Sequence, residues 1–510
     1  MTAILASLPI FVILVLMVGF RWGAARAGAA GYLAAFLLAV AFFGARTDVL
    51  AYAHTKSLLL TFDVLYIIWA AFLLYRVADE AGAIKTIGEA LPRLTRDRGM
   101  LAILIGWVFA SFLQGAGGFG VPVAVTAPLL VGLGFTPLVA VLIPSIGHGW
   151  AVTFGSLGSS FQALMSATGM GADALAAFPA LFLGVSAVIS GLLVAHIADG
   201  WAGVKRLMAP ALIIGTVMGT VQYLIAVAGL WNIAAFGGGL AGLLVCIPLV
   251  QWGQKSSPGS RLPIAGKPLL VALSAYLILV LLTIIILLVP AVKDFFGQVA
   301  IAVPFPETTT TLGYISPAGT NRPIRIFTHA GAILVYSSLL AFLLYKRAGL
   351  YKNGAAKRIL NGTLKSVLAS SLSIAEMVAM AVLMQQSGMT EAIAQGLADM
   401  VGAAFPLVAP WIGAVGAFMT GSNTNSNVVF AALQMRTAEL LAYSVPIILA
   451  GQTAGAALAS VAAPTKVVVG ASTAGMAGKE GEVLRALIGY TVILVSLISL
   501  LTLLAVFIWK

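Results

Sequence analysis

The sequence predicts an all-α polytopic membrane protein, with about 12 transmembrane helices and two re-entrant hairpins in inverted repeats. Three observations predict this fold class. Of the 510 residues, 61% are hydrophobic and only 9% are charged, which is too little polar surface for a soluble globule. Two glycine-rich or polar stretches, 114–122 and 420–427, interrupt apolar sequence. These stretches also align when the chain is shifted by 306 positions.

The composition places the chain in a lipid bilayer, with a mean hydropathy of +1.07. The net charge of +12 does not indicate a nucleic-acid patch, because many basic residues sit in short connections between apolar runs. Cys246 is the only cysteine, and no Cys/His spacing suggests a metal, so we expect no internal disulfide, metal or cofactor. The run 1–20 lacks a basic start, and we interpret it as a first span rather than a cleaved signal peptide.

The apolar runs that can span are each near the 20 or so residues that a helical crossing needs. They are approximately 3–20, 27–44, 57–76, 174–198, 207–229, 232–251, 268–290, 329–345, 363–386 and 485–509. Two longer runs, 136–168 and 442–474, are broken by Gly, Pro, Ser and Thr. We interpret each of the two as one discontinuous crossing.

The arms around the first interruption, 101–113 and 121–133, have 13 residues each and reach only about 20 Å as helices. Neither arm can span a hydrocarbon core of roughly 30 Å alone, so we predict a re-entrant hairpin at each interruption. Irregular backbone at membrane depth is tolerated only where it is buried in protein or lines an aqueous cavity. The hairpin tips are therefore where we expect a bound solute.

The charges of the connections predict the topology. With re-entrant hairpins, every basic cluster falls on one face, which the positive-inside bias makes cytoplasmic. The clusters lie at 21–26, 76–98, 205–206, 255–267, 346–358 and 479–485. The stretch 291–328 becomes an external loop, where Lys293, Arg322 and Arg325 are a mild exception to the bias.

The internal repeat places Gly115 on Gly421 and Gly82 on Gly388 at the same offset of 306, without a gap. The loop 76–98 carries five Lys/Arg, whereas the matching stretch 387–404 has none and carries two acidic residues. Opposite charge bias indicates opposite sides, so we predict inverted repeats. We expect a single transmembrane domain over 1–510. Its repeat cores lie at approximately 57–200 and 363–510, with connecting spans and the external loop in 201–362.

The two tips carry the candidate binding groups. Glycines let backbone amides approach a ligand, and an anion would find a helix N-terminus at the first tip, where Pro122 suits the first turn of the second arm. The second tip supplies hydroxyls and amides, which suit a carboxylate that bears a hydroxyl, and Ser426 is a candidate N-cap for a helix starting near Val428. The alternative is a helix break that only lets helices pack closely, but two related breaks favour binding. The candidate binding residues are Gly115, Gly117, Gly118, Phe119, Gly120, Ser422, Asn423, Thr424, Asn425, Ser426, Asn427 and Lys466.

Ionisable residues at membrane depth are further candidates, since a charge near the midplane costs about 3 kcal/mol or more unless it is paired or hydrated. Lys466 could meet a substrate carboxylate, or it could snorkel or form a structural ion pair. Glu376 could pair with Lys466, carry a coupled proton or serve only a structural role. His148 could relay protons, although a lone His is more often a hydrogen-bonded core residue. Asp63 lies nearer a membrane end, and we expect it to be solvated.

Several motifs carry a resemblance that spans most of the chain. They are Leu113-Gln-Gly-Ala-Gly-Gly-Phe-Gly-Val-Pro-Val-Ala-Val, Leu130-Val-Gly-Leu-Gly-Phe, Gly421-Ser-Asn-Thr-Asn-Ser-Asn and Gly478-Lys-Glu. The chain thereby resembles the lactate permease family of the ion transporter superfamily, whose members import lactate and glycolate with protons. The triplet Ser422-Asn423-Thr424 is also similar to the hairpin tips of divalent-anion/sodium symporters. Family members commonly carry an acidic residue where this chain has Gln114, and an Asn-x-x-Pro-Val-type stretch where it has 145–150. The candidates for proton coupling are Gln114, His148 and Glu376.

The resemblance implies a secondary transporter of the plasma membrane, in a prokaryote the inner membrane. It would import lactate, glycolate or a related 2-hydroxymonocarboxylate by proton symport. Sodium coupling is the first alternative, because unwound backbone and Ser, Asn and Thr oxygens also bind sodium. An intramembrane enzyme would need a nucleophile–base or metal set at depth, and the sequence shows neither that nor a nucleotide motif. We therefore expect no enzyme activity. The expected partners are the anion, protons or sodium, and lipid, but no nucleic acid.

Overall fold

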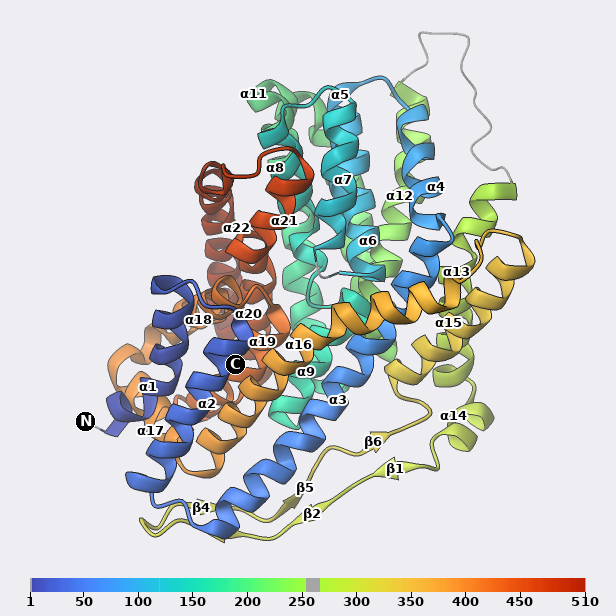
Figure 1. Cartoon of the computed structure of the whole chain (residues 1–510). Helices are drawn as coiled ribbons and strands as arrows, with labels where there is room; N and C mark the ends of the chain where they lie inside the picture. Colours follow the sequence, from blue (N-terminus) through green and yellow to red (C-terminus); the bar gives the residue numbers. More distant parts are fainter. Residues whose placement is uncertain (1, 119, 254–266, 510) are drawn as a thin grey trace.

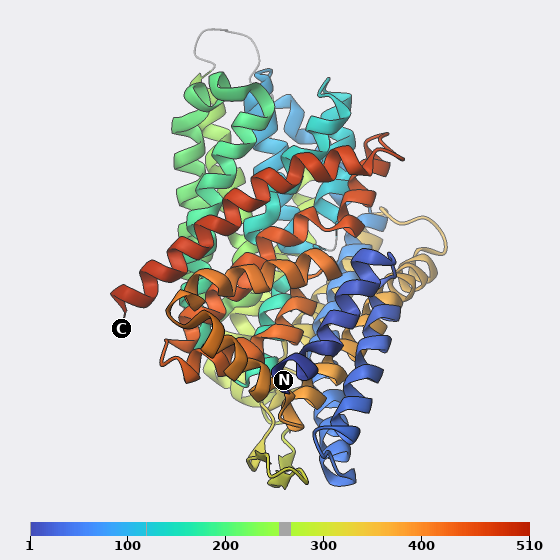
Figure 2. The same cartoon turned by 90° about the vertical axis from the view of Figure 1, so that its left-hand side faces the viewer.

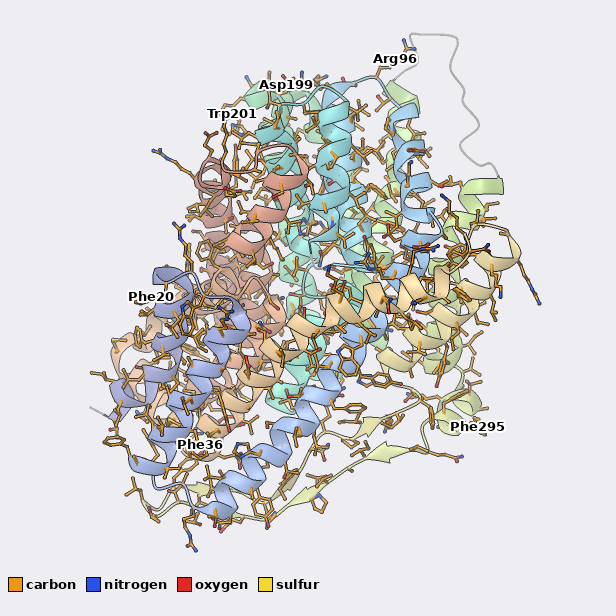
Figure 3. All side chains as sticks on the ribbon, viewed as in Figure 1. Phe20, Phe36, Arg96, Asp199, Trp201 and Phe295 are labelled. Atoms are coloured by element: carbon orange, nitrogen blue, oxygen red, sulfur yellow. The ribbon has the colours of Figure 1, made fainter. Side chains whose placement is uncertain are left out.

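The computed structural model describes residues 2–118, 120–253 and 267–509, so Phe119 and nearly all of the predicted basic connection 255–267 lie outside it. In the described part, 12 helical stretches are long and apolar enough to cross a membrane, which confirms the predicted all-α polytopic fold. They are Thr2–Gly19, Ala24–Ala41, Thr47–Glu80, Arg98–Ala116, Pro137–Thr168, Ala177–Val250, Leu269–Leu288, Ala330–Arg347, Ala355–Gln386, Met389–Thr420, Val445–Ala462 and Glu480–Ile508. Large apolar side chains such as Phe20, Trp201 and Phe295 lie on the outside of the bundle, as lipid contact requires (Figure 3).

The N-terminal helices pack with helices from the second half of the chain. α1 (Thr2–Leu14), α2 (Ala24–Ala41) and α3 (Thr47–Glu80) lie beside α16 (Ala355–Gln386) and α17 (Met389–Val401) (Figures 1 and 2). Small residues permit this approach, since a Cβ added at Gly31 of α2 would lie 3.0 Å from the Met380 sulfur of α16. The first and last thirds of the chain therefore share one packed layer.

The first interruption separates two antiparallel helical arms. α4 (Ala83–Ala90) precedes the first arm, which runs through α5 (Arg98–Leu101), a π-helical segment (Ala102–Phe109) and α6 (Ala110–Ala116). After Gly117–Gly120, α7 (Val121–Gly132) forms the second arm and begins with Pro122 in its first turn, as predicted. The prediction that neither arm can span is wrong for the first arm. Asp97 caps it by accepting from the Met100 amide, and the predominantly apolar helical stretch then runs over 19 residues, Arg98–Ala116. Whether the pair is re-entrant stays a prediction.

The second interruption lies between α18 (Phe405–Thr420) and α19 (Asn423–Leu440). Gly421 takes a left-handed φ of +71° and ends α18, and the Ser422 hydroxyl caps α19 by accepting from the Asn425 amide at 3.2 Å. The expected cap at Ser426 is therefore wrong, because the nearer hydroxyl at Ser422 starts the helix several residues before Val428.

Both long runs that were predicted to be discontinuous contain a break. In the first, α8 (Pro137–His148) and a 3-10 turn (Gly149–Ala151) are followed by residues 152–158 and then by α9 (Ser159–Thr168). In the second, α20 (Val445–Ala459) and a 3-10 turn (Ser460–Ala462) are followed by the extended residue Ala463 and α21 (Pro464–Thr473). We call residues 152–158 the first break and residue 463 the second break.

The helix bounds follow the offset of 306. Gly82 begins α4 with a φ of +71°, and Gly388 begins α17 with a φ of +84°. Gly169 ends α9 with a φ of +73°, and Gly475 follows α21 with a φ of +77°. Such left-handed positions favour glycine, so the same backbone requirement occurs at matching places in both halves. The repeat cores at 57–200 and 363–510, and their inversion, stay predictions.

The remaining helices connect and cover these cores (Figures 1 and 2). They are α10 (Ala172–Leu175), α11 (Ala177–Ile225, interrupted at Asp199 and Gly200), α12 (Ala234–Gly253), α13 (Lys267–Leu288), α14 (Pro290–Phe296), α15 (Ala330–Arg347) and α22 (Glu480–Ile508). α12 packs on both α6 and α11, and α22 packs on α18 and α20.

The predicted external loop forms a narrow antiparallel ribbon between α14 and α15 (Figure 1). Its three nested pairs join β1 (Ala300–Ile301) to β6 (Ile324–Arg325), β2 (Pro304–Phe305) to β5 (Gly319–Thr320), and β3 (Thr308–Thr309) to β4 (Ile315–Ser316). At the tip of the ribbon, the Thr311 amide donates to the Gly44 carbonyl at 2.9 Å. We call this segment, 300–325, the outer ribbon.

Candidate functional site

The tip of the second interruption lies against the first break. The Asn423 side-chain amide donates to the Thr153 hydroxyl at 3.0 Å, and the Thr153 hydroxyl lies 3.2 Å from the Thr453 carbonyl of α20. The Thr424 hydroxyl lies 3.0 Å from the Ser160 hydroxyl of α9. Segments from both halves of the chain therefore meet at one buried polar centre.

Asn427 and Ser426 hold this centre together. The Asn427 side-chain amide donates to the Ser160 carbonyl and to the Thr453 hydroxyl, both at 2.9 Å. The Ser426 hydroxyl donates to the Gly413 carbonyl at 2.8 Å and accepts from the Gln452 amide at 3.2 Å. With these partners, Asn427 and Ser426 join α19 to its neighbours and have a structural part in the site.

Two amides of the second tip each keep a free acceptor. The Asn423 and Asn425 side-chain oxygens are buried, and neither has a hydrogen-bond partner among the described residues. Asn425 uses its other side-chain atom to donate to the Ser373 hydroxyl at 3.1 Å. A buried amide oxygen without a partner costs about 1–3 kcal/mol, so these atoms are available to a donor that arrives with a ligand.

The first tip packs against the first break as well. Gly118 has a φ of +56°, and a Cβ added there would overlap the Ser156 hydroxyl. A Cβ on Gly155 would lie 2.8 Å from the Gln114 side-chain nitrogen, while the Gln114 side-chain oxygen is buried with no partner in the described part of the chain. Only glycine fits at these positions, which lets the backbone of the tip and the break approach closely.

The other glycines of the first tip differ in what they approach. A Cβ on Gly115 would overlap the backbone of Phe236, so Gly115 serves the close packing of α6 on α12. A Cβ on Gly117 would lie 3.2 Å from the Tyr75 ring, and one on Gly120 would reach only Val469 of α21, at 4.0 Å. The alternative interpretation, a helix break that only lets helices pack closely, therefore explains Gly115. It does not explain Gly120, which has open space beside it.

Lys466 and His148 lie near each other, whereas Glu376 lies apart from both. Lys466 donates to the Ser460 hydroxyl at 2.9 Å, at the second break. His148 bonds the Pro144 carbonyl through Nδ1 at 2.6 Å, and its buried Nε2 has no partner within the described ranges. Glu376 faces α2, where its Oε2 lies 3.1 Å from the position of a Cβ on Gly28. No ion pair joins Glu376 to Lys466 in the part of the chain that the structure describes.

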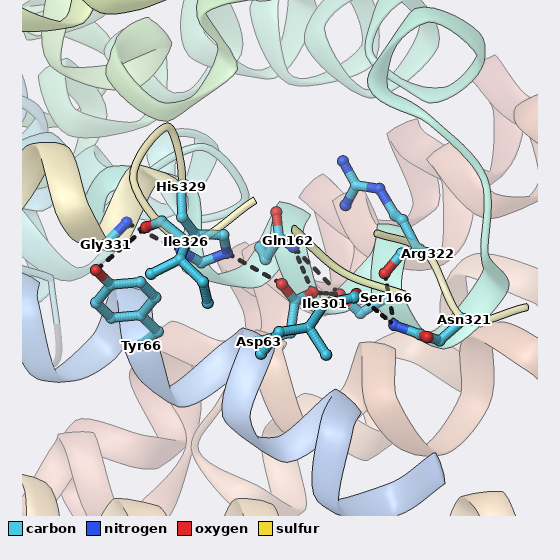
Figure 4. A network of polar contacts seen from close by, with 10 residues as sticks. All are labelled: Asp63, Tyr66, Gln162, Ser166, Ile301, Asn321, Arg322, Ile326, His329 and Gly331. Carbon is cyan, nitrogen blue, oxygen red and sulfur yellow. Dashed lines mark hydrogen bonds and ion pairs between the residues drawn. The ribbon is translucent and has the colours of Figure 1, made fainter. Parts of the chain in front are cut away.

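A second polar cluster was missed in the sequence. Asp63 of α3 is only 5% exposed, so the expectation that it is solvated is wrong. Its carboxylate accepts from His329 Nε2 at 3.0 Å, from the Gln162 amide at 2.5 Å and from the Ser166 hydroxyl (Figure 4). The sequence did carry a signal for this burial, because Asp63 lies well inside the apolar run 57–76 and water reaches such a position only at a cost in free energy. Its partner His329 is 266 positions away and gave no local signal.

Cavities lie beside this cluster rather than at the tips. One cavity of about 320 Å³ and another of about 210 Å³ are both lined by Asp63 and by Arg322 of the outer ribbon. The space beside Asn425 and Ser426 measures only about 10 Å³, which is about the volume that one water needs. The residues of the polar centre are themselves buried, since Thr153, Ser160 and Asn423 are each at most 5% exposed. The centre is therefore closed in this conformation, and α9 carries residues that face it and residues that line the two larger cavities.

The chain matches known proteins over its whole length. A family model described as L-lactate permease matches residues 2–509. The L-lactate permease of Salmonella typhimurium is 27% identical over 86% of this chain and 84% of its own length. The glycolate permease GlcA of Escherichia coli is 28% identical over 100% of this chain and 96% of its own length. Among solved structures, the Alcanivorax borkumensis YdaH transporter covers 90% of this chain and 89% of its own, with a TM-score of 0.49 and 16% identity.

The family match covers far more than half of the chain, and the relatives are permeases, which are transporters rather than enzymes. The 12 membrane-spanning stretches agree with this class and make the chain a multi-pass membrane protein, in bacteria one of the inner membrane. The chain belongs to the L-lactate permease family.

Proposed function

We propose that this chain imports lactate, glycolate or a related 2-hydroxymonocarboxylate, and that the anion binds between the tips of the two interruptions. The observation that carries this proposal is the pair of buried, unpartnered amide oxygens on Asn423 and Asn425 where both halves meet. An amide oxygen accepts from a hydroxyl, so this pair suits the 2-hydroxyl of such a substrate. The named substrates of the relatives, lactate and glycolate, both carry that group.

The substrate carboxylate needs donors rather than acceptors. The first turn of α19 leaves backbone N–H groups without helical partners, and its dipole favours a negative charge. Lys466 adds a cation that is now bonded only to the Ser460 hydroxyl among the described residues. We propose that Lys466 and the start of α19 hold the carboxylate, with the backbone of Gly117 and Gly118 on the opposite side.

The test is the Asn425→Ala variant. Removing this side chain takes away an acceptor for the substrate and a donor to Ser373, a penalty of about 1–3 kcal/mol, or roughly five- to a hundred-fold in affinity. Thr309→Ala is the control, because Thr309 is exposed on the outer ribbon, and it should leave uptake unchanged. The measurement is uptake of labelled lactate and glycolate into proteoliposomes made from monodisperse protein. Wild-type affinity in Asn425→Ala would show that the anion binds elsewhere.

We further propose that protons drive the import. Gln114 cannot carry a proton because an amide does not titrate, which leaves His148, with its unpartnered Nε2, and Glu376. Sodium is the second candidate, since the same free oxygens on Asn423 and Asn425 are good sodium ligands. Uptake under a pH gradient without sodium, compared with uptake under a sodium gradient at equal pH, separates the two. Uptake that requires sodium and ignores the pH gradient would refute proton coupling.

A further inference from the structure

The cavity of about 210 Å³ gathers basic side chains from different elements. Lys293 comes from α14, and Arg322 and Arg325 come from the outer ribbon. Asp63 and His329 also line this cavity. This volume is many times what one water needs, so a small organic anion can enter.

Nearby carboxylates offset the charge of this cavity only in part. Asp63 and Asp173 lie close enough to act on Arg322, and Asp294 lines an adjoining cavity together with Lys293 and Arg325. The one carboxylate in the cavity's own lining, Asp63, is already paired with His329 and accepts from two further donors. None of Lys293, Arg322 and Arg325 forms an ion pair with any residue that the structure describes. Figure 4 shows the Arg322 guanidinium above the Asp63 cluster, with no bond drawn to it. Partial burial lowers the pKa of Arg322, but an arginine remains a cation at neutral pH.

The membrane topology does not account for the position of Lys293, Arg322 and Arg325. They lie on the predicted outer face, where the positive-inside bias disfavours short-loop Lys and Arg. A planar guanidinium with two flanking cations is the arrangement that recognises a carboxylate, since arginine can donate to both of its oxygens.

The cavity also adjoins the closed polar centre. Gln162, which lines the cavity, lies two positions along α9 from Ser160, whose hydroxyl contacts Thr424. Asn232, also in the lining, lies against Gly158 of the first break, where a Cβ would be 3.1 Å from the Asn232 Cα. Only α9 and the first break separate an anion in the cavity from the tips.

We propose that this cavity is an outer binding site for carboxylate anions, in which Arg322, Lys293 and Arg325 hold the anion before it reaches the hairpin tips. The inference rests on the proposed function for the identity of the transported anion, lactate or glycolate. The site itself recognises the carboxylate group, and acetate therefore binds there as well.

The test measures the chemical accessibility of the cavity and does not depend on transport. Thr328 lines the cavity, so Thr328→Cys in a Cys246→Ala background is labelled from outside with impermeant methanethiosulfonate reagents, one anionic and one cationic. With each rate divided by that reagent's rate on a free thiol in solution, we expect the anionic reagent to react about tenfold faster than the cationic one, because a cleft of one charge sign concentrates the opposite ion. L-lactate and acetate should slow the anionic reagent, and neutral lactamide should not.

Arg322→Gln added to that background should remove most of the tenfold preference and of the carboxylate protection. Arg46→Gln is the matched control: Arg46 is exposed near Gly44, beside the tip of the outer ribbon, and does not line the cavity. It should leave both readouts unchanged. Equal reagent preference with and without Arg322, the absence of carboxylate protection, or no labelling from outside would each overturn the proposal.

The transport assay separates this proposal from the proposed function. Arg322→Gln should raise the substrate concentration for half-maximal uptake about fivefold at low ionic strength, less at high ionic strength, and leave the maximal rate unchanged. Asn425→Ala should keep the labelling pattern at Thr328→Cys and weaken the affinity for transported lactate roughly five- to a hundred-fold. Protection by acetate in a protein that does not import lactate would leave the outer site standing and refute the proposed substrate.

Discussion

Asp63 shows how one buried carboxylate can organise distant parts of the chain. It brings together His329 at the start of α15 and Gln162 and Ser166 of α9, which are the segments that lie between the outer cavities and the tips. Removing one partner of this buried, hydrogen-bonded pair leaves the other group or its donors unsatisfied. The pair therefore couples α3, α9 and α15.

Asp63→Asn is predicted to destabilise the protein by about 3 kcal/mol, since breaking a buried pair leaves its partner uncompensated. Adding His329→Gln should cost clearly less than the sum of the two single effects, because the contact is already lost. The measurement is a double-mutant cycle on the thermal unfolding of the detergent-solubilised protein. Glu307→Gln, an exposed carboxylate of the outer ribbon, is the control and should change nothing. Strict additivity of the two substitutions would contradict the coupling.

At the scale of elements, the first tip and the first break fit together through unusual backbone. Ser156 and Leu157 have φ values of +48° and +56°, and Gly118 faces Ser156 with a φ of +56°. Residues other than glycine in this region cost on the order of 1–3 kcal/mol each, and such strain persists only where the surroundings enforce it. The break is therefore held in shape by the tip against which it packs.

Substitutions at Gly118 are expected to lower uptake according to side-chain size. Gly118→Val should abolish it, and Gly118→Ala should reduce it, because the new Cβ overlaps the Ser156 hydroxyl. Ser156→Gly should restore part of the uptake of Gly118→Ala by removing that hydroxyl. Gly134→Ala is the matched control, since Gly134 also has a left-handed φ, of +87°, but nothing within 4 Å of an added Cβ. If Gly134→Ala lowers uptake as much as Gly118→Ala, backbone strain alone explains the effect.

The sequence predicts the interrupted elements well because Gly, Pro, Ser and Thr leave a local signature in apolar runs. The sequence predicts less well the residues at which these helices begin and end. Ser422 and Ser426 are equally good caps by residue type, and only the fold shows that the Ser422 hydroxyl meets a free amide. The outer ribbon was missed because its strands have two residues each, too few for an alternating pattern. The Asp63–His329 pair joins positions 266 apart, which no local pattern contains.

At the scale of the whole molecule, the fold class follows from composition, whereas the meeting of Asn423 with Thr153 depends on long-range packing. Arg96 lies at one end of the bundle, and the outer ribbon lies at the other (Figures 1 and 3). The stretch 387–404, predicted from its charges to be external, forms α17 and a 3-10 turn (Gly402–Ala404). These positions allow the predicted inversion of the repeats to be tested.

Single cysteines in the Cys246→Ala background report the sidedness. We expect an impermeant thiol reagent added from outside to modify Asp399→Cys, at the end of α17, and to spare Arg96→Cys until the membrane is permeabilised. Both positions are exposed on the protein, so accessibility in detergent should be equal and serves as the control. Labelling of both positions from the same side would rule out inverted repeats.

The outer ribbon also has a mechanical consequence. Its base continues into α14 and α15, while its tip is bonded to the packed layer that the N-terminal helices form with α16. The Thr311 amide donates to the Gly44 carbonyl, and the Ser316 hydroxyl donates to the Gln386 carbonyl at 3.3 Å. A paired ribbon cannot lengthen without losing its cross-strand bonds. The ribbon therefore fixes the distance on this face between α14 and α15 at its base and the helices that its tip contacts. Helices on this face can therefore open a path to the outside only by tilting beneath the ribbon or by detachment of the ribbon's tip. They cannot move straight apart while the ribbon stays paired and attached at both ends.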